Sequence, residues 1–168
     1  MANNSLKQTH QHGAVMVEMA LTLGIFMVIL LALFEFALLM FTWSKGVEAT
    51  RLGSRLAVVS NPVVSLASLD CNVVRRIDTT CATGSCAAIE TRMRGLLPQL
   101  NAGQIHISYA CSEVGYSGSP GEYRVYDVTV SIRDFRTTLA VPGLLGFPLQ
   151  LTMPDFSTTR TSEDLHTP

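Results

Sequence analysis

The sequence predicts an α+β fold in which a long N-terminal helix packs on a small antiparallel sheet. Residues 14–43 form one apolar run, a proline-free helical pattern continues to residue 59, and apolar and polar residues alternate later in the chain. The apolar run explains the unusual composition, since 48% of the 168 residues are apolar and 15% are charged. An average globular chain has roughly 25% charged residues.

The apolar run is long enough for a transmembrane helix. Of its 30 residues, 25 are apolar, and its two charged residues are Glu18 and Glu35. They are 17 residues apart, which is about 25 Å along a helix. The hydrocarbon core of a bilayer is about 30 Å thick. Each carboxylate can therefore lie near one interface, and two interfacial acids on an ordinary anchor are one interpretation of the run.

A polar segment, residues 1–13, precedes the run and ends in Gly13. A secretory signal places the small residue after its apolar core, whereas here the small residue comes first. Cleavage after Gly13 would remove a leader, keep the helix, and leave Ala14 as the N-terminus with Glu18 as the fifth residue. Residues four apart share a helix face. The new α-amine and the Glu18 carboxylate could therefore neutralise each other, within one chain or between neighbouring subunits.

Residues 44–61 continue the helical pattern beyond the transmembrane segment. Ala49, Gly53, Leu56 and Ala57 form a small, apolar face that would allow close packing. Asn61 and Pro62 end the pattern, because the residue before proline avoids helical geometry. A packed stem and a simple juxtamembrane linker both fit this segment.

The remaining residues, 62–168, are predicted to form a small α+β domain. Residues 63–80 indicate a short helix with loops, and residues 87–97 a second helix. Alternation over 105–109 and 126–133 predicts two strands that the turn-rich segment 116–123 joins into a hairpin. A further strand is expected around Leu149, Leu151 and Met153.

Four cysteines fall in this domain: Cys71, Cys81, Cys86 and Cys111. An even number in a small exported domain favours disulfides, and three pairings are possible. Zinc is the rival interpretation, because four residues separate Cys81 from Cys86, as in some zinc sites. The other two cysteines are remote and no histidine pair supports a metal.

The composition argues against several functional classes. The net charge is −1 and the charges are scattered, so no basic surface for nucleic acid is expected. Motifs for nucleophilic catalysis, zinc hydrolysis or phosphate binding are absent from the sequence. His106 lies in a predicted strand, where a structural role is expected. We therefore expect no enzyme activity, no cofactor and no metal.

A family resemblance emerges from the N-terminal third. Gly13, followed by AVMVE and the apolar run, resembles a class III prepilin leader. Further along, the chain is similar to the TadE-like family of tight-adherence (Flp) pilus assembly proteins. The residues that carry this second similarity are Glu35, Phe36, Arg51, Gly53 and Arg55. A weaker similarity to the end of that family covers residues 127–153.

The resemblance implies a minor pilin or pseudopilin with a pseudopilin-like fold, cut by a prepilin peptidase after Gly13. It implies pilins, minor pilins and the pilus assembly platform as partners. The location would be the bacterial inner membrane, with the C-terminal domain in the periplasm or carried into an extracellular pilus. Lys45, Arg51 and Arg55 follow the apolar run and favour the opposite orientation, against the leader and the cysteines. TadE-like and TadF-like members are not separated.

One alternative function stays open. An uncleaved, membrane-anchored binding module with a disulfide-bonded extracytoplasmic domain would have the same composition. It would not explain the spacing of Gly13, Ala14 and Glu18.

Overall fold

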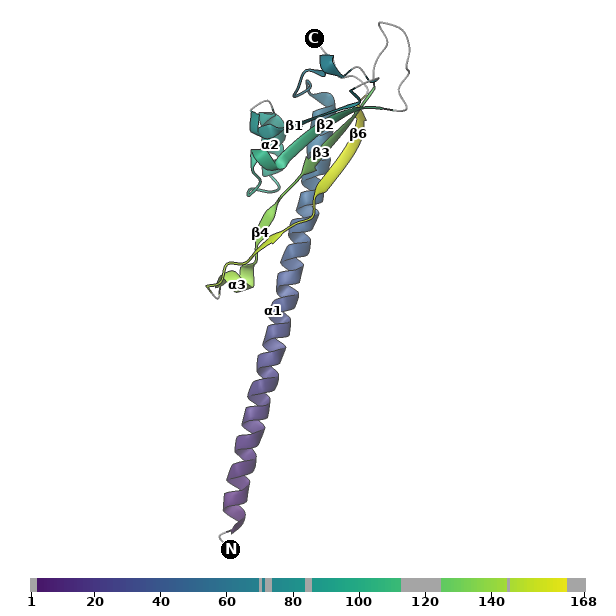
Figure 1. The fold of residues 1–168 in the computed structure, drawn as a ribbon. Coiled ribbons are helices and arrows are strands. Elements are labelled where there is room, and N and C mark those ends of the chain that lie inside the picture. Colours follow the sequence, from purple (N-terminus) through teal and green to yellow (C-terminus); the bar gives the residue numbers. More distant parts are fainter. Residues whose placement is uncertain are drawn as a thin grey trace. The chain divides into compact units, whose positions relative to one another are not determined.

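The computed structural model describes residues 3–69, 71, 74–83, 86–112, 125–144 and 146–162, with side chains from residue 13 onward except at 68, 83 and 144. Its elements are α1 (Asn3–Val59), β1 (Arg76–Thr80), α2 (Ala87–Arg94), β2 (Ile105–Cys111), β3 (Tyr126–Ile132), β4 (Arg136–Thr138), α3 (Ala140–Leu144), β5 (Gln150–Thr152) and β6 (Phe156–Ser162) (Figure 1). The predicted α+β class, a long helix with a small antiparallel sheet, is confirmed. The predicted turn at 116–123 lies outside the described residues.

The chain divides into two compact units. The helical unit comprises Met1–Met40 and the loop Leu139–Leu149, and the sheet unit comprises Phe41–Thr138 and Gln150–Pro168. Assignment of the loop to the helical unit was not anticipated from the sequence, which placed it in the C-terminal domain. The helix α1 enters both units, and its two parts meet different surroundings.

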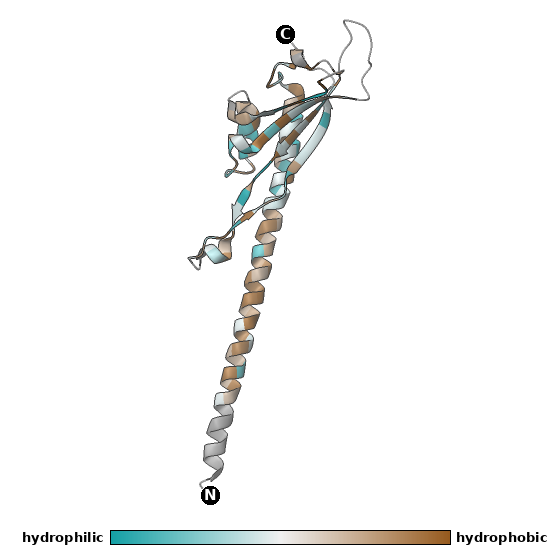
Figure 2. Cartoon of the chain, in the orientation of Figure 1, coloured by the Kyte–Doolittle hydropathy of each residue, from teal (hydrophilic) through white to brown (hydrophobic). Residues whose placement is uncertain are grey.

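In the helical unit, α1 is apolar on all sides. Every side chain from residue 13 to residue 34 is exposed, and hydrophobic residues dominate this stretch (Figure 2). The helix is long and apolar enough to cross a membrane by its length and composition. It ends at Val59, three residues before Pro62, as the proline rule predicts.

The sheet unit contains a four-stranded antiparallel sheet of order β1-β2-β3-β6. The predicted hairpin of β2 and β3 forms, with Ile107 opposite Val130. The buried side chains of these central strands make the core: Ile105, Ile107, Tyr109, Tyr126, Val128, Val130 and Ile132. A separate short hairpin joins β4 to β5, which includes the strand expected around Leu151.

Residues 63–80 differ from their prediction. Instead of a short α-helix they contain a 3₁₀ turn (Leu66–Ser68) and the strand β1. Isolated apolar residues at helical spacing suggested the helix, but Arg76–Thr80 pairs along its length with β2. The second helix is confirmed but ends at Arg94, before Gly95, instead of at residue 97.

In the sheet unit, α1 lies alongside β6. The Trp43 ring meets the Phe156 ring edge-on, with centroids 4.9 Å apart. Seven residues further along the helix, the Thr50 hydroxyl lies 3.0 Å from the hydroxyl of Thr158, which is two residues beyond Phe156 on the strand. The helix and the strand therefore run side by side in the same direction.

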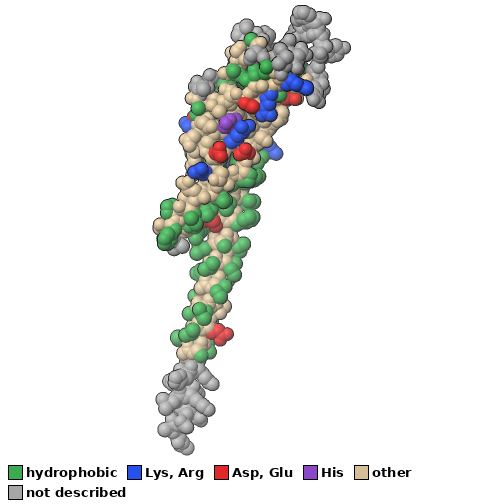
Figure 3. Space-filling model, viewed as in Figure 1, with side chains coloured by type: hydrophobic (Ala, Val, Ile, Leu, Met, Phe, Trp, Pro, Cys, Tyr) green, Lys and Arg blue, Asp and Glu red, His purple; other side chains and the backbone are tan. Residues whose placement is uncertain are grey.

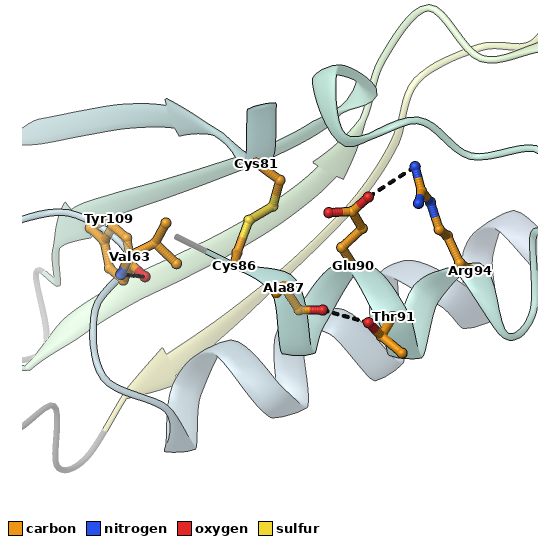
Figure 4. Close-up of a disulfide and its surroundings, with 8 residues drawn as sticks. All are labelled: Val63, Cys81, Cys86, Ala87, Glu90, Thr91, Arg94 and Tyr109. Carbon is orange, nitrogen blue, oxygen red and sulfur yellow. Dashed lines mark hydrogen bonds and ion pairs between the residues drawn. A yellow bond between two sulfur atoms is a disulfide. The ribbon is translucent and has the colours of Figure 1, made fainter. Parts of the chain in front are cut away.

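Two disulfides form, which the sequence favoured over zinc. Cys71 pairs with Cys111, and Cys81 pairs with Cys86, with Cα separations of 5.7 and 5.5 Å. The second bond joins the 3₁₀ turn after β1 to the residue that precedes α2 (Figure 4). The first bond joins the segment before β1 to the last residue of β2.

The same region also ties down the chain that leaves α1. The backbone N–H of Val63 donates a hydrogen bond of 3.1 Å to the Tyr109 hydroxyl (Figure 4). Tyr109 is fully buried, and burial raises the pKa of its phenol. The hydroxyl therefore stays neutral and available as an acceptor at physiological pH.

Candidate functional site

The predicted cleavage junction lies on the exposed part of α1. Gly13, Ala14 and Glu18 are all exposed, and a Cβ added at Gly13 would meet no atom within 4 Å. The backbone here is helical, and the Thr22 hydroxyl bonds the Glu18 carbonyl oxygen at 2.7 Å. Glycine in a helix costs roughly 1 kcal/mol relative to alanine. The junction is thus sterically open, and its weakest helical residue is Gly13.

Glu35 does not behave as a plain interfacial acid. Its Oε1 accepts a hydrogen bond from the Ala140 N–H at 2.8 Å, and its Oε2 accepts one from the Val141 N–H at 2.7 Å. Ala140 and Val141 are the first two residues of α3, whose amides have no intrahelical acceptor. One carboxylate therefore satisfies two orphan donors that lie 105 and 106 residues away in sequence.

We call this arrangement the Glu35 clamp: the Glu35 carboxylate and the amides of Ala140 and Val141. Hydrogen bonds to a charged group contribute about 1.5–3 kcal/mol each, and partial exposure favours the lower end. The two bonds therefore compensate the Glu35 carboxylate for part of the water it loses late in an apolar helix.

Burial along α1 agrees with the clamp. Between residues 13 and 40, only Glu35, Leu38 and Leu39 are half-buried. Residues three and four apart share one helix face, so these three form a single stripe. Phe36, the other half of the predicted motif pair, points away and is 59% exposed. The Glu-Phe pair therefore divides into an acid that holds the loop and an aromatic ring left free on the surface.

The element Arg51-Leu-Gly53-Ser-Arg55 also has two faces. Arg51 and Arg55 are exposed, and Arg51 forms an ion pair of 3.8 Å with Glu48. Gly53 is buried, and a Cβ added there would lie 2.7 Å from the Met93 sulfur and 3.2 Å from Val130. The glycine allows α1, α2 and β3 to approach closely, while the arginines face solvent.

The small face predicted for residues 44–61 is buried. Ala49 is 0% and Ala57 1% exposed, and Leu56 is half-buried. Sequence reasoning missed Gly46, where an added Cβ would lie 2.7 Å from the Phe156 ring. Its spacing of seven residues from Gly53 was a usable signal, since seven residues are close to two helical turns.

Other candidate chemistry remains sparse in the part of the chain that the structure describes. No cluster of three His, Cys, Asp or Glu residues there could hold a metal ion. His106 is half-buried on β2, and its pKa is lowered from 6.5, first by burial and then by Arg133. Figure 3 shows most of the charged side chains over the sheet unit, with hydrophobic and a few acidic side chains along α1.

The comparisons with known proteins point to the same segment. Residues 13–55 match the model of a family described as TadE-like protein. The match spans about a quarter of the chain and includes every motif residue discussed above, from Gly13 to Arg55, but none of the cysteines. The chain matches no curated protein and no solved structure. The resemblance drawn from the sequence is confirmed.

Proposed function

We propose that this TadE-like protein of the tight-adherence pilus system is a minor pilin or pseudopilin, matured by a prepilin peptidase that hydrolyses the Gly13–Ala14 bond. The observation that carries the proposal is the placement of Gly13, Ala14 and Glu18 at the start of the apolar run, in a part of α1 whose side chains are exposed. A lipid anchor needs only the apolar run. A subunit that moves from lipid into a filament also needs a way to handle charge at its N-terminus.

Cleavage would create that charge. Hydrolysis leaves a carboxylate on Gly13 and an ammonium on Ala14, one helical turn from the Glu18 carboxylate. An ion pair gains strength as water is excluded, although desolvation opposes it. In the bilayer the pair would be formed within one chain, and in a filament the carboxylate would meet the Ala14 ammonium of a neighbour.

The helix and the sheet unit then have separate roles. The exposed part of α1 would anchor the protein in the inner membrane and later pack with other pilins. The sheet unit would lie in the periplasm, an oxidising compartment where disulfides such as Cys71–Cys111 persist. The role is structural assembly, with no chemistry performed by the chain itself.

Mass spectrometry of protein purified from cells with an active prepilin peptidase tests the cleavage. We expect a mature chain that begins at Ala14. A Gly13→Leu variant should stay uncut, whereas Gly24→Leu, at another open helical glycine, should be processed normally. An intact leader in the unsubstituted protein would contradict the proposal and favour the uncleaved binding module.

The role of Glu18 is tested separately. A Glu18→Ala variant should be cleaved normally but should enter pili poorly, because the ammonium of Ala14 loses its partner. Co-purification with sheared pili, measured against the membrane-bound pool, gives the readout. Normal assembly of a correctly cut Glu18→Ala protein would remove the pairing mechanism while leaving the cleavage result intact.

A further inference from the structure

We infer that the loop Leu139–Leu149 is a second membrane contact of this chain, lying in the lipid interface beside α1 and held there by Glu35. The inference rests on the membrane anchoring of α1 in the proposed function and does not depend on pilus assembly. Its partner is a lipid surface, specifically the boundary between headgroups and acyl chains.

The Glu35 clamp sets the depth of the loop. Both carboxylate oxygens of Glu35 bond the start of α3, at 2.8 and 2.7 Å, so the loop lies at the level of Glu35. That residue lies within the apolar run, 17 residues beyond Glu18. This spacing is about 25 Å along the helix in a hydrocarbon core about 30 Å thick. A loop bonded to Glu35 therefore lies at the far edge of the acyl region.

The side chains of the loop suit that depth. Residues 137–154 contain no charged residue. Two large apolar side chains project from the loop, with Phe147 72% and Leu149 56% exposed. Apolar groups of this size at an interface favour insertion into lipid.

The backbone of the loop is prepared for a medium poor in water, where unsatisfied amides are costly. The N–H groups of Gly143, Gly146 and Phe147 bond carbonyl oxygens within the loop, at 3.3, 3.1 and 2.9 Å. The Leu139 N–H bonds the Leu149 carbonyl at 2.9 Å. Ala140 and Val141 are satisfied by Glu35, and position 142 is a proline, which has no N–H.

Lipid is favoured over a second copy of the chain as the occupant of this surface. Exposed apolar side chains of α1 flank Glu35, which holds the loop, with Phe34 58% and Phe36 59% exposed. The same lipid that surrounds this part of α1 would therefore cover Phe147 and Leu149.

Depth-dependent fluorescence quenching tests the inference. The full, oxidised chain carrying Phe147→Cys, labelled with an environment-sensitive dye, is reconstituted in phosphatidylcholine/phosphatidylglycerol vesicles. Nitroxides attached near the headgroup should quench the dye several-fold more than nitroxides at the acyl-chain end or aqueous iodide. A label at Val28→Cys should respond to the deep nitroxide, and one at Arg160→Cys on β6 to iodide.

The possible quenching results separate the position of the loop from the anchoring of α1 and from contact with a second copy. Iodide quenching at position 147, with normal deep quenching at 28, overturns the inference but leaves the anchor in place. Iodide quenching at 28 overturns the anchor itself. Protection at 147 that disappears when the protein is diluted in lipid assigns the loop to a second copy and also overturns the inference.

The clamp is tested on the same label. Glu35→Leu should move the dye at 147 toward iodide, because the loop loses both hydrogen bonds, while Glu18→Leu should leave it unchanged. Glu35→Gln keeps one acceptor oxygen and should give an intermediate result. An unshifted dye in Glu35→Leu, with Trp43 fluorescence confirming a folded sheet unit, would overturn the role of Glu35.

Discussion

The two parts of α1 belong to one continuous helix, but the space around their glycines differs. In the helical unit, a Cβ added at Gly13 or Gly24 meets nothing within 4 Å. In the sheet unit, a Cβ added at Gly46 or Gly53 collides with Phe156 or Met93. The early glycines lie in open surroundings, whereas the later ones lie in close contact with side chains of the sheet unit.

Removal of the disulfides should have the largest effect on the free energy of unfolding. Both bonds lie in the sheet unit, so the effect should be confined to that unit. Replacing Cys71 and Cys111 with serine opens a bond between residues 40 apart, which should cost about 4 kcal/mol of unfolding free energy in the chain-entropy description. Replacing Cys81 and Cys86, which are 5 apart, should cost about 2 kcal/mol.

Denaturant unfolding of the full chain in detergent measures both. Trp43, the single tryptophan, packs on Phe156 and reports the sheet unit, while far-UV circular dichroism reports the helix. The tryptophan transition should shift, and the helical signal of the apolar part should persist. If the tryptophan and circular dichroism transitions shifted equally, the two parts of α1 would not differ in their dependence on the sheet unit.

The glycine comparison gives the next effect. Gly53→Ala should destabilise the sheet unit by about 1–3 kcal/mol, the usual cost of overpacking a core. Gly24→Ala should be neutral or should stabilise the helix by about 1 kcal/mol, since alanine is the better helix former. The same two unfolding signals provide the measurement. A Gly53→Ala protein as stable as the parent would contradict the prediction and would show that the Met93 side chain can move aside without cost.

The smallest effect is the pH dependence through His106. Burial lowers the pKa of His106 in the folded state below its ordinary value of 6.5, so below pH 6.5 the unfolded chain binds more protons. Stability should therefore be complete above pH 6.5 and should fall as the pH drops through 6.5 toward the lower folded pKa. The charged groups that act on it are Arg133, which also lowers the pKa, and Asp78, Asp134 and Asp155, which raise it.

Unfolding midpoints between pH 7.5 and 5.5, followed by Trp43 fluorescence, measure this slope. His106→Gln should flatten it, and the helical signal of the apolar part should not change over this range. A slope that persists unchanged in His106→Gln would assign it to other groups.

Much of the fold was predictable because its signals are local. The end of α1 follows from Pro62, and the strands β2 and β3 alternate clearly because both lie in the centre of the sheet. The strands β1 and β6 escaped prediction because they lie at the edges of the sheet. Sequences such as RIDTT and FSTTRTS have mostly half-buried or exposed residues and no strong apolar alternation, although threonine itself favours strands.

The candidate site was predictable to a different degree. The positions of Gly13, Glu18, Glu35 and Gly53 followed from spacing and resemblance. The partners of Glu35 did not, because they are backbone amides more than a hundred residues away and carry no side-chain signature. The disulfide pairing was also open, because it depends on how β1 pairs with β2 and so brings Cys71 close to Cys111.

The Glu35 clamp has a geometric consequence for assembly. A carboxylate that grips two successive amides fixes the rotation of α1 about its own axis relative to the loop. The stripe of Glu35, Leu38 and Leu39 is thereby covered by the loop at this level. In the proposed assembly, neighbouring subunits would approach from the remaining directions, including the one that Phe36 occupies. A single acid would thus give an otherwise uniform apolar rod a defined front and back.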